Sequence, residues 1–132
     1  MPKPNNVPLK LLFDGIGSTD IQLLKDWGEY LVIESEGKKK MATTQLRKFF
    51  GEVKRLQATG VLRDVILLEP KMAYAVGRAI KENKGNDNLK ISDFYKCLSP
   101  LIRAIDQDKA KFKNFVNIYE AIVAYHKAAG GE

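Results

Sequence analysis

Three residue types that often build active sites are nearly missing from this chain of 132 residues. Cysteine, histidine and tryptophan occur once each, as Cys97, His126 and Trp27. A single cysteine excludes an intramolecular disulfide and favours a reducing compartment, and one histidine with one cysteine excludes most zinc and transition-metal sites. The sequence therefore predicts no metal site and no cofactor.

Long apolar segments are missing as well. The apolar run near the N-terminus, Leu9 to Phe13, is too short for a secretory signal, and no segment reaches the roughly 20 residues that span a bilayer. Hydrophobic residues make up 45% of the chain and charged residues 29%, which are the proportions of a folded domain and not of a disordered chain. We expect a cytoplasmic protein without membrane contact.

What the sequence does contain is helical periodicity. Apolar residues recur at intervals of three and four along most of the chain, and no extended alternation with a period of two is present. The predicted helices cover about residues 21–31, 43–59, 70–83, 89–105 and 108–129. The expected fold is all-α, a compact single-domain bundle of about five helices.

Three segments are expected to depart from regular helix. Residues 1–15, with three prolines in the first eight positions, are predicted to be a flexible arm in front of a helical domain at residues 16–132. The turn at Lys38–Lys40 is interpreted as a mobile basic loop. Pro100 lies inside the fourth predicted helix and is expected to break or bend it.

Positive charge is concentrated in the middle of the sequence. Residues 38–84 carry twelve Lys or Arg against four Asp or Glu, a net charge of +8. Residues 1–37 sum to −3 and residues 85–132 to +1, which gives the total of +6. A regional positive field on a small protein commonly faces a polyanion, although basic residues also form faces that are simply solvated.

The basic residues of two successive predicted helices fall on one side of each helix, opposite the apolar side. On the segment 43–59 they are Arg47, Lys48, Lys54 and Arg55. On the segment 70–83 they are Lys71, Arg78 and Lys81, with Tyr74 beside them. A row of cations that includes guanidinium groups suits the repeating phosphates of a nucleic acid. Because no base-reading motif is present, we expect binding through backbone and shape.

The last predicted helix carries a broad apolar surface. Its aromatic and aliphatic residues spread beyond the stripe that one neighbouring helix would cover, so we expect a seam for self-association or for a partner subunit. The residues of this predicted seam are Ile118, Tyr119, Ile122 and Tyr125. His126 lies beside them and is interpreted as half-buried and hydrogen-bonded, with a catalytic or RNA-contacting role as the alternative.

No constellation of residues indicates catalysis, so we predict no catalytic residue. Cys97 has only Lys96 as a basic neighbour and is interpreted as packed in the core. Asp106 and Asp108 precede the last helix and are explained by an N-cap. Trp27 is expected in the core, with base stacking as the alternative. The glycines show neither dinucleotide-binding nor P-loop spacing, and a small hydrolase or nuclease is the least favoured function.

Three blocks of the sequence carry a family resemblance. The first reads Thr43-Thr44-Gln45-Leu46-Arg47-Lys48-Phe49-Phe50, followed by Glu52-Val53-Lys54. The second reads Leu68-Glu69-Pro70-Lys71-Met72-Ala73-Tyr74, with Gly77-Arg78. The third contains Phe112, Phe115 and Glu120-Ala121-Ile122-Val123-Ala124-Tyr125-His126-Lys127. In this order and spacing, the blocks resemble the small subunit of type III-A (Csm-type) CRISPR effector complexes.

The resemblance implies a small, helical, non-catalytic subunit of an RNA-guided ribonucleoprotein in antiviral defence. Several copies would stack along the inner side of the complex, against the duplex of guide RNA and target RNA and next to the large subunit and the backbone subunits. RNA cutting would belong to the backbone subunit, and nucleotide cyclisation to the large subunit.

The resemblance also implies which residues contact the RNA backbone. Those that match its motifs are Arg47, Lys48, Lys54, Lys71 and Arg78, with Lys127 as a further candidate. Arg55 and Lys81 join this set from the geometry of the basic faces alone. The alternative function is a protein–protein scaffold whose basic face meets acidic partner surfaces and contacts little or no RNA.

Overall fold

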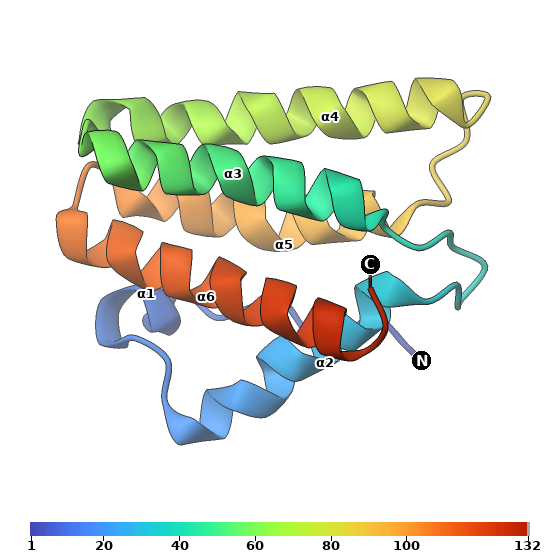
Figure 1. The fold of residues 1–132 in the computed structure, drawn as a ribbon, viewed down its shortest axis with the longest axis horizontal. Coiled ribbons are helices and arrows are strands. Elements are labelled where there is room, and N and C mark those ends of the chain that lie inside the picture. The colour runs from blue at the N-terminus through green and yellow to red at the C-terminus, as the bar shows by residue number, and fades with distance from the viewer. Residues whose placement is uncertain (132) are drawn as a thin grey trace.

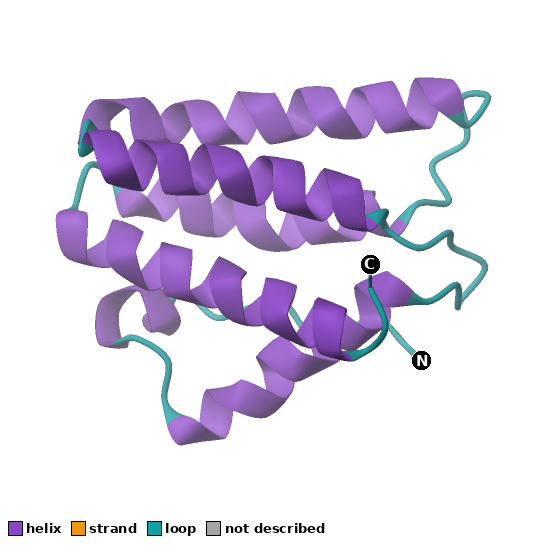
Figure 2. Cartoon of the chain, in the orientation of Figure 1, coloured by secondary structure: helices purple, strands orange, loops and turns teal. Residues whose placement is uncertain are grey.

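The structure, a computed structural model, describes residues 1–131 and consists of helices joined by short connections (Figure 1 and Figure 2). The α-helices are α1 (Lys10–Asp14), α2 (Ile21–Val32), α3 (Thr43–Thr59), α4 (Leu68–Glu82), α5 (Lys90–Ile105) and α6 (Lys109–Ala128). Two 3₁₀-helices, η1 (Ser18–Asp20) and η2 (Leu62–Leu67), directly precede α2 and α4. No β-strand occurs within the described residues, which confirms the predicted all-α class.

The helices form a bundle in which α3 and α4 lie side by side along one edge of the molecule (Figure 1). Helix α5 packs against α4, and α6 packs against α3 and α5. Helices α1 and α2 cover α6 on the side away from α4 (Figure 1). The outer surfaces of α3 and α4 are therefore left uncovered by the rest of the described chain.

Helix α3 has the bounds that the sequence predicts because local interactions fix both of its ends. The side-chain oxygen of Gln45 accepts the Ala42 N–H at 3.1 Å, which pairs a free donor just before the helix. At the other end Gly60 adopts a left-handed φ of 69° and its N–H donates to the Leu56 carbonyl at 3.0 Å.

Pro100, expected from the sequence to break or bend the fourth long helix, does not break it. Helix α5 continues from Lys90 to Ile105 with Pro100 in its interior. The Pro100 side chain is exposed, while the residues on both sides of it, Ser99 and Leu101, are buried. The ring therefore points to solvent, and the packing of the opposite face holds the helix together across the missing N–H.

The N-terminal segment that was predicted to be a flexible arm packs into the bundle. Val7, Leu11 and Leu12 are buried, and the last two belong to α1. The indole N–H of Trp27 donates to the Asn5 carbonyl at 2.8 Å, and the Asn114 amide donates to the Leu12 carbonyl at 2.7 Å. Apolar burial and these two hydrogen bonds tie the segment to α2 and α6, in spite of its prolines.

The centre of the bundle is rich in aromatic rings. Trp27 is fully buried and contacts Tyr30 edge-on and Phe94 at a tilt, which confirms its predicted place in the core. Helices α2 and α6 approach closely at Gly28, where an added Cβ atom would lie 2.6 Å from the Tyr125 Cβ atom. Helix α6 is thus clamped between α2 on one side and α3 and α5 on the other.

Candidate nucleic-acid interface

Every residue that the sequence predicts for RNA contact is exposed in the structure. The eight side chains are Arg47, Lys48, Lys54, Arg55, Lys71, Arg78, Lys81 and Lys127. Four belong to α3, three to α4 and one to the last turn of α6. Helices α3 and α4, which carry seven of the eight residues, lie side by side along one edge of the molecule (Figure 1). We call these eight residues the basic face.

One carboxylate joins the cations of α3 to those of α4. Glu52 Oε2 lies 3.1 Å from Arg55 Nη2 on its own helix and 3.1 Å from Lys71 Nζ on the neighbouring helix. These hydrogen bonds, first that of Lys71 and then that of Arg55, lower the pKa of Glu52, so the carboxylate stays ionised. Two cations share one anion, which leaves a net positive charge at this bridge.

Between α3 and α4 lies a groove of about 460 Å³ that we call the α3–α4 groove. Its lining includes the basic residues Lys48, Lys71 and Arg78 and the acidic residues Glu52 and Glu82. Its apolar lining includes Met41, Phe49, Met72, Ala75, Ala79 and Ile91, and Tyr74 also borders it. One residue of the predicted α3 stripe, Lys48, and two of the α4 stripe, Lys71 and Arg78, therefore border a single groove.

Two further residues of the basic face, Arg47 and Lys54, lie near α6. Lys54 Nζ lies 3.9 Å from Glu120 Oε2 on α6, and it also lies over the Phe50 ring at 5.9 Å. Arg47 is close enough to His126 that its positive charge contributes, after burial, to lowering the pKa of that histidine. The basic face consequently extends from the edge of α6 across α3 to α4.

Carboxylates partly neutralise the basic face but do not cancel it. Glu52, Glu120 and Glu82 pair with Lys54, Arg55, Lys71 and Arg78 at distances of 3.1 to 3.9 Å. Within residues 1–131 no ion pair is found for Arg47, Lys48, Lys81 or Lys127. Eight cations against three carboxylates leave a net charge of +5. Exposed pairs of this kind contribute little to stability and can exchange for a phosphate partner.

The predicted seam on the last helix is wrong for three of its four residues. Ile118, Tyr119 and Ile122 are fully buried inside this chain, and only Tyr125 is half-buried. The Tyr119 hydroxyl donates to the Leu46 carbonyl at 2.9 Å, and its ring stacks on Phe50. The breadth of the apolar surface on α6 is explained by α1, α2, α3 and α5, which all pack on it.

His126 and Cys97 are interior residues. His126 is 1% exposed and so more deeply buried than the predicted half-buried state, and its Nε2 atom has no hydrogen-bond partner among the described residues. Burial and then the charge of Arg47 lower its pKa, against an opposing effect of the Met41 backbone. Burial raises the pKa of Cys97 to about 11, so the thiol stays protonated and packs in the core as expected.

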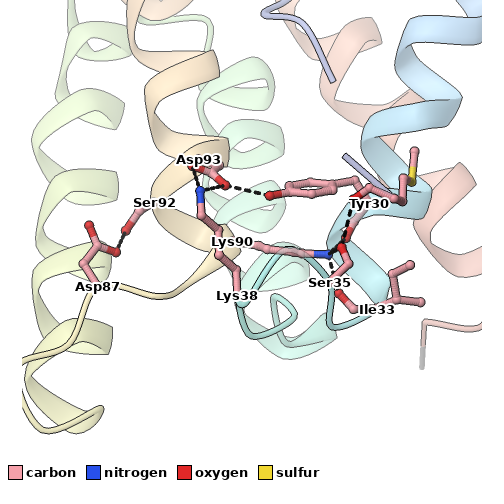
Figure 3. A network of polar contacts seen from close by, with 9 residues as sticks. Tyr30, Ile33, Ser35, Lys38, Asp87, Lys90, Ser92 and Asp93 are labelled. Atoms are coloured by element: carbon pink, nitrogen blue, oxygen red, sulfur yellow. Dashed lines mark hydrogen bonds and ion pairs between the residues drawn. The ribbon is translucent and has the colours of Figure 1, made fainter. Parts of the chain in front are cut away.

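A buried lysine that was not predicted from the sequence lies at the C-terminal end of α2 (Figure 3). Lys90 is fully buried, and its Nζ donates to the carbonyls of Tyr30 and Ile33 at 2.7 and 2.6 Å and to the Ser35 hydroxyl at 2.6 Å. Nζ also lies 4.0 Å from the centre of the Tyr30 ring. Two of the three hydrogen bonds thus go to carbonyls at the C-terminal end of α2, where a positive charge is favourable.

Asp93 completes this polar cluster and fixes the basic turn before α3 (Figure 3). Its carboxylate accepts the Tyr30 hydroxyl at 2.8 Å and Lys38 Nζ at 2.9 Å. Lys39 Nζ donates to the Asn83 side chain at 2.7 Å. Lys38 and Lys39 therefore have defined partners, unlike the mobile loop predicted for Lys38–Lys40. The signal in the sequence was helical spacing, since Lys90 and Asp93 share a face of α5 with the buried Phe94.

Two features of other functional classes are not found in the described part of the chain. No group of three or more His, Cys, Asp or Glu side chains suited to a metal ion occurs within residues 1–131. In the same part of the chain, no helix is both long enough and apolar enough to cross a membrane.

Comparison with known proteins identifies the family. A family model described as Csm2 Type III-A matches residues 18–132, a range that begins at η1 and includes α2 to α6 with the whole basic face. Comparison with curated proteins gave no match, and neither did comparison with solved structures. The chain belongs to the Csm2 Type III-A family, the small subunits of type III-A CRISPR complexes.

Proposed function

We propose that this protein is a non-catalytic small subunit that holds RNA by its backbone within the type III-A complex in the cytoplasm. Several copies would stack along the guide and target RNA, beside the large subunit and the backbone subunits. The observation that carries the proposal is the basic face, eight exposed cations that face outward on α3, α4 and α6. RNA cutting and nucleotide cyclisation would belong to other subunits.

The geometry of the basic face favours a phosphate chain over a merely solvated surface. Lys48 on α3 and Lys71 and Arg78 on α4 border the same groove, so cations from two helices are brought together. Phosphates that repeat along a strand need several cations in a row, and arginine can bind a phosphate with two parallel hydrogen bonds. A surface that contacts only water requires neither cations gathered from two helices nor arginine side chains among them.

The proposal predicts that removal of cations from this face lowers the affinity for RNA and makes that affinity less dependent on the salt concentration. In the variant Arg47→Ala, Lys48→Ala, Lys54→Ala, Arg78→Ala, four potential phosphate contacts are lost. If each contact releases about one counterion from an RNA duplex, the slope of log Kd against log salt concentration should fall by about 3 to 4. Fluorescence anisotropy with a labelled duplex, between about 50 and 200 mM salt, measures this slope.

The matched control removes four exposed lysines from other parts of the surface, namely Lys10, Lys25, Lys96 and Lys113. Both variants lose the same formal charge, so a general electrostatic effect would change them equally. The proposal expects the control to keep most of the affinity and of the slope. Equal losses in the two variants would count against a defined RNA-binding face.

A second candidate function is a protein scaffold whose basic face meets an acidic partner. The ion pairs of Glu52, Glu82 and Glu120 favour it, because they show that half of the basic face already accepts carboxylate partners. In that case the four-cation variant would bind RNA as the control does, but it would be lost from the purified complex. Mass analysis of complexes that incorporate each variant separates the two functions.

A further inference from the structure

The α3–α4 groove has an apolar interior that a phosphate chain alone does not use. Phe49, Met72 and Ile91, each at most 9% exposed, line its base from α3, α4 and α5, and the exposed side chains of Tyr74 and Ala75 border it. Charged phosphates gain nothing from contact with these side chains, because the hydrophobic effect acts on apolar surface. The occupant that fits this groove must therefore combine an apolar face with negative charge.

We propose that the α3–α4 groove holds one unpaired nucleotide of the bound RNA, with its base against the apolar lining and its flanking phosphates on Lys48, Lys71 and Arg78. This inference rests on the proposed function and names the feature of the RNA that this site recognises. The groove of about 460 Å³ lies in the size range of small-molecule sites, which is roughly 300 to 1,000 Å³.

The two carboxylates in the groove favour a base over other anionic occupants. Glu52 and Glu82 would repel the carboxylates of an acidic amphipathic helix laid along the groove, whereas a phosphate at its border can replace them as partners of Lys71 and Arg78. A base edge instead presents amino or imino N–H donors, which carboxylates accept. Glu52 is held in its ionised form by Lys71 and Arg55, and a carboxylate with two oxygens has further lone pairs for a base.

Tyr74 supplies an aromatic surface at the border of the groove. Its side chain is 70% exposed, the highest value among the large apolar side chains that remain at the surface. It lies three positions from Lys71 and four from Arg78 on α4, so the ring and the two cations share one side of the helix. A ring beside cations is the arrangement with which proteins bind unstacked bases of single-stranded segments.

The test compares two RNAs that differ by one nucleotide. Full-length protein is titrated against a fully paired RNA duplex and against the same duplex with a single unpaired adenosine, at low ionic strength, with fluorescence anisotropy as the readout. We expect the bulged duplex to bind about tenfold more tightly, the size of one base–aromatic stacking contact. Tyr74→Ala and the groove-filling variant Ala75→Trp should both abolish this preference.

Control variants separate an effect of filling the groove from a general effect of the added ring or of unfolding. Gln22→Trp places the same ring on the exposed surface of α2, outside the groove, and should keep the preference. Circular dichroism checks that each variant is folded. Equal affinity of the wild-type protein for the two RNAs would overturn this inference and leave the proposed function standing. Absence of binding to either RNA would overturn both.

A second readout locates the base. An unpaired 5-iodouridine in the bulge, irradiated in the complex and mapped by mass spectrometry, should cross-link to Tyr74. A cross-link confined to another helix would overturn the placement. Competition by an acidic amphipathic peptide that binds the groove without RNA would assign the groove to a protein partner and also overturn it.

Discussion

At the scale of single residues, Lys90 is placed where a lysine side chain is seldom found. Burial lowers its pKa, and the nearby Asp93 opposes this effect. Its Nζ donates three hydrogen bonds with donor–acceptor distances of 2.7 Å or less. These hydrogen bonds, and the position of the charge at the C-terminal end of α2, offset the cost of removing the ammonium group from water. Through Asp93 the same cluster holds Lys38, which leads into α3.

Substitution of Lys90 should therefore destabilise the fold. Lys90→Met keeps the length of the side chain but leaves two carbonyls and one hydroxyl without their donor, which should lower the free energy of unfolding by about 1 to 3 kcal/mol. Urea unfolding followed by circular dichroism measures the change. Lys96→Met, at an exposed position of the same helix, is the control and should change stability by less than about 0.5 kcal/mol. Equal effects would mean that the Lys90 cluster contributes no special stability.

His126 should make the stability of the fold depend on pH. Its folded pKa is lowered by burial, so the unfolded chain binds a proton first, near pH 6.5. The free energy of unfolding is then highest above about pH 7 and falls as the pH drops below about 6.5, by at most about 1.4 kcal/mol per pH unit. Urea unfolding between about pH 7.5 and 5.5 tests this, because no other histidine titrates in the chain.

The control for this pH dependence is His126→Gln, which cannot titrate. Its unfolding free energy should be nearly constant over the same pH range, whatever its absolute value. A variant that retains the full slope would show that another group causes the pH dependence.

At the scale of elements, the crossing of α2 and α6 depends on a residue without a side chain. A Cβ atom at Gly28 would lie 2.6 Å from Tyr125 Cβ and 2.7 Å from the backbone nitrogen of His126, and the backbone of α6 cannot easily move. Gly28→Ala should lower the free energy of unfolding by about 1 to 3 kcal/mol, in spite of the better helix propensity of alanine. Thermal or urea unfolding measures the change.

The matched substitution is Gly77→Ala in α4, where an added Cβ atom meets nothing within 4 Å. Here only the helix propensity changes, so the protein should gain about 0.5 to 1 kcal/mol. A destabilised Gly77→Ala variant, or a Gly28→Ala variant as stable as the wild type, would contradict the packing of these helices.

The bounds of a helix could be predicted from the sequence where interactions within or beside that helix determine them. Contacts between segments that lie far apart in the sequence could not be predicted. The ends of α3 depend on Gln45 and Gly60, which lie in or beside the helix itself. The burial of Leu11 and Leu12 depends on α6, about a hundred positions away along the chain. Likewise, periodicity showed that the basic residues point away from the core, but the shared groove depends on how α3 and α4 pack.

At the scale of the whole molecule, the apolar surface of α6 serves the fold of the single chain. The prediction of a seam took the width of that surface as a sign of a partner, whereas α1 and α2 cover it within the same chain. Ile118, Tyr119 and Ile122 are consequently not available to a partner or to a second copy. The basic face, in contrast, is left open by every described element of the bundle.

A charged residue inside this surface should unfold the protein and not merely dissociate an oligomer. Ile118→Asp buries an unpaired carboxylate in the core and should lower the free energy of unfolding by about 4 kcal/mol or more. Circular dichroism should show loss of helix or a strongly lowered melting temperature. If the variant folds and differs from the wild type only in its oligomeric state, as measured by light scattering, Ile118 would belong to a self-association seam as the sequence predicted.

Protection of lysines by RNA tests most directly whether the basic face follows a phosphate chain. Full-length protein is acetylated with a limiting reagent, with and without an RNA duplex at low ionic strength, and each lysine is quantified by mass spectrometry. RNA should protect Lys48, Lys54, Lys71 and Lys81, and it should leave Lys10, Lys25 and Lys96 as reactive as in the free protein. Equal protection of both groups, or protection of neither, would contradict the account.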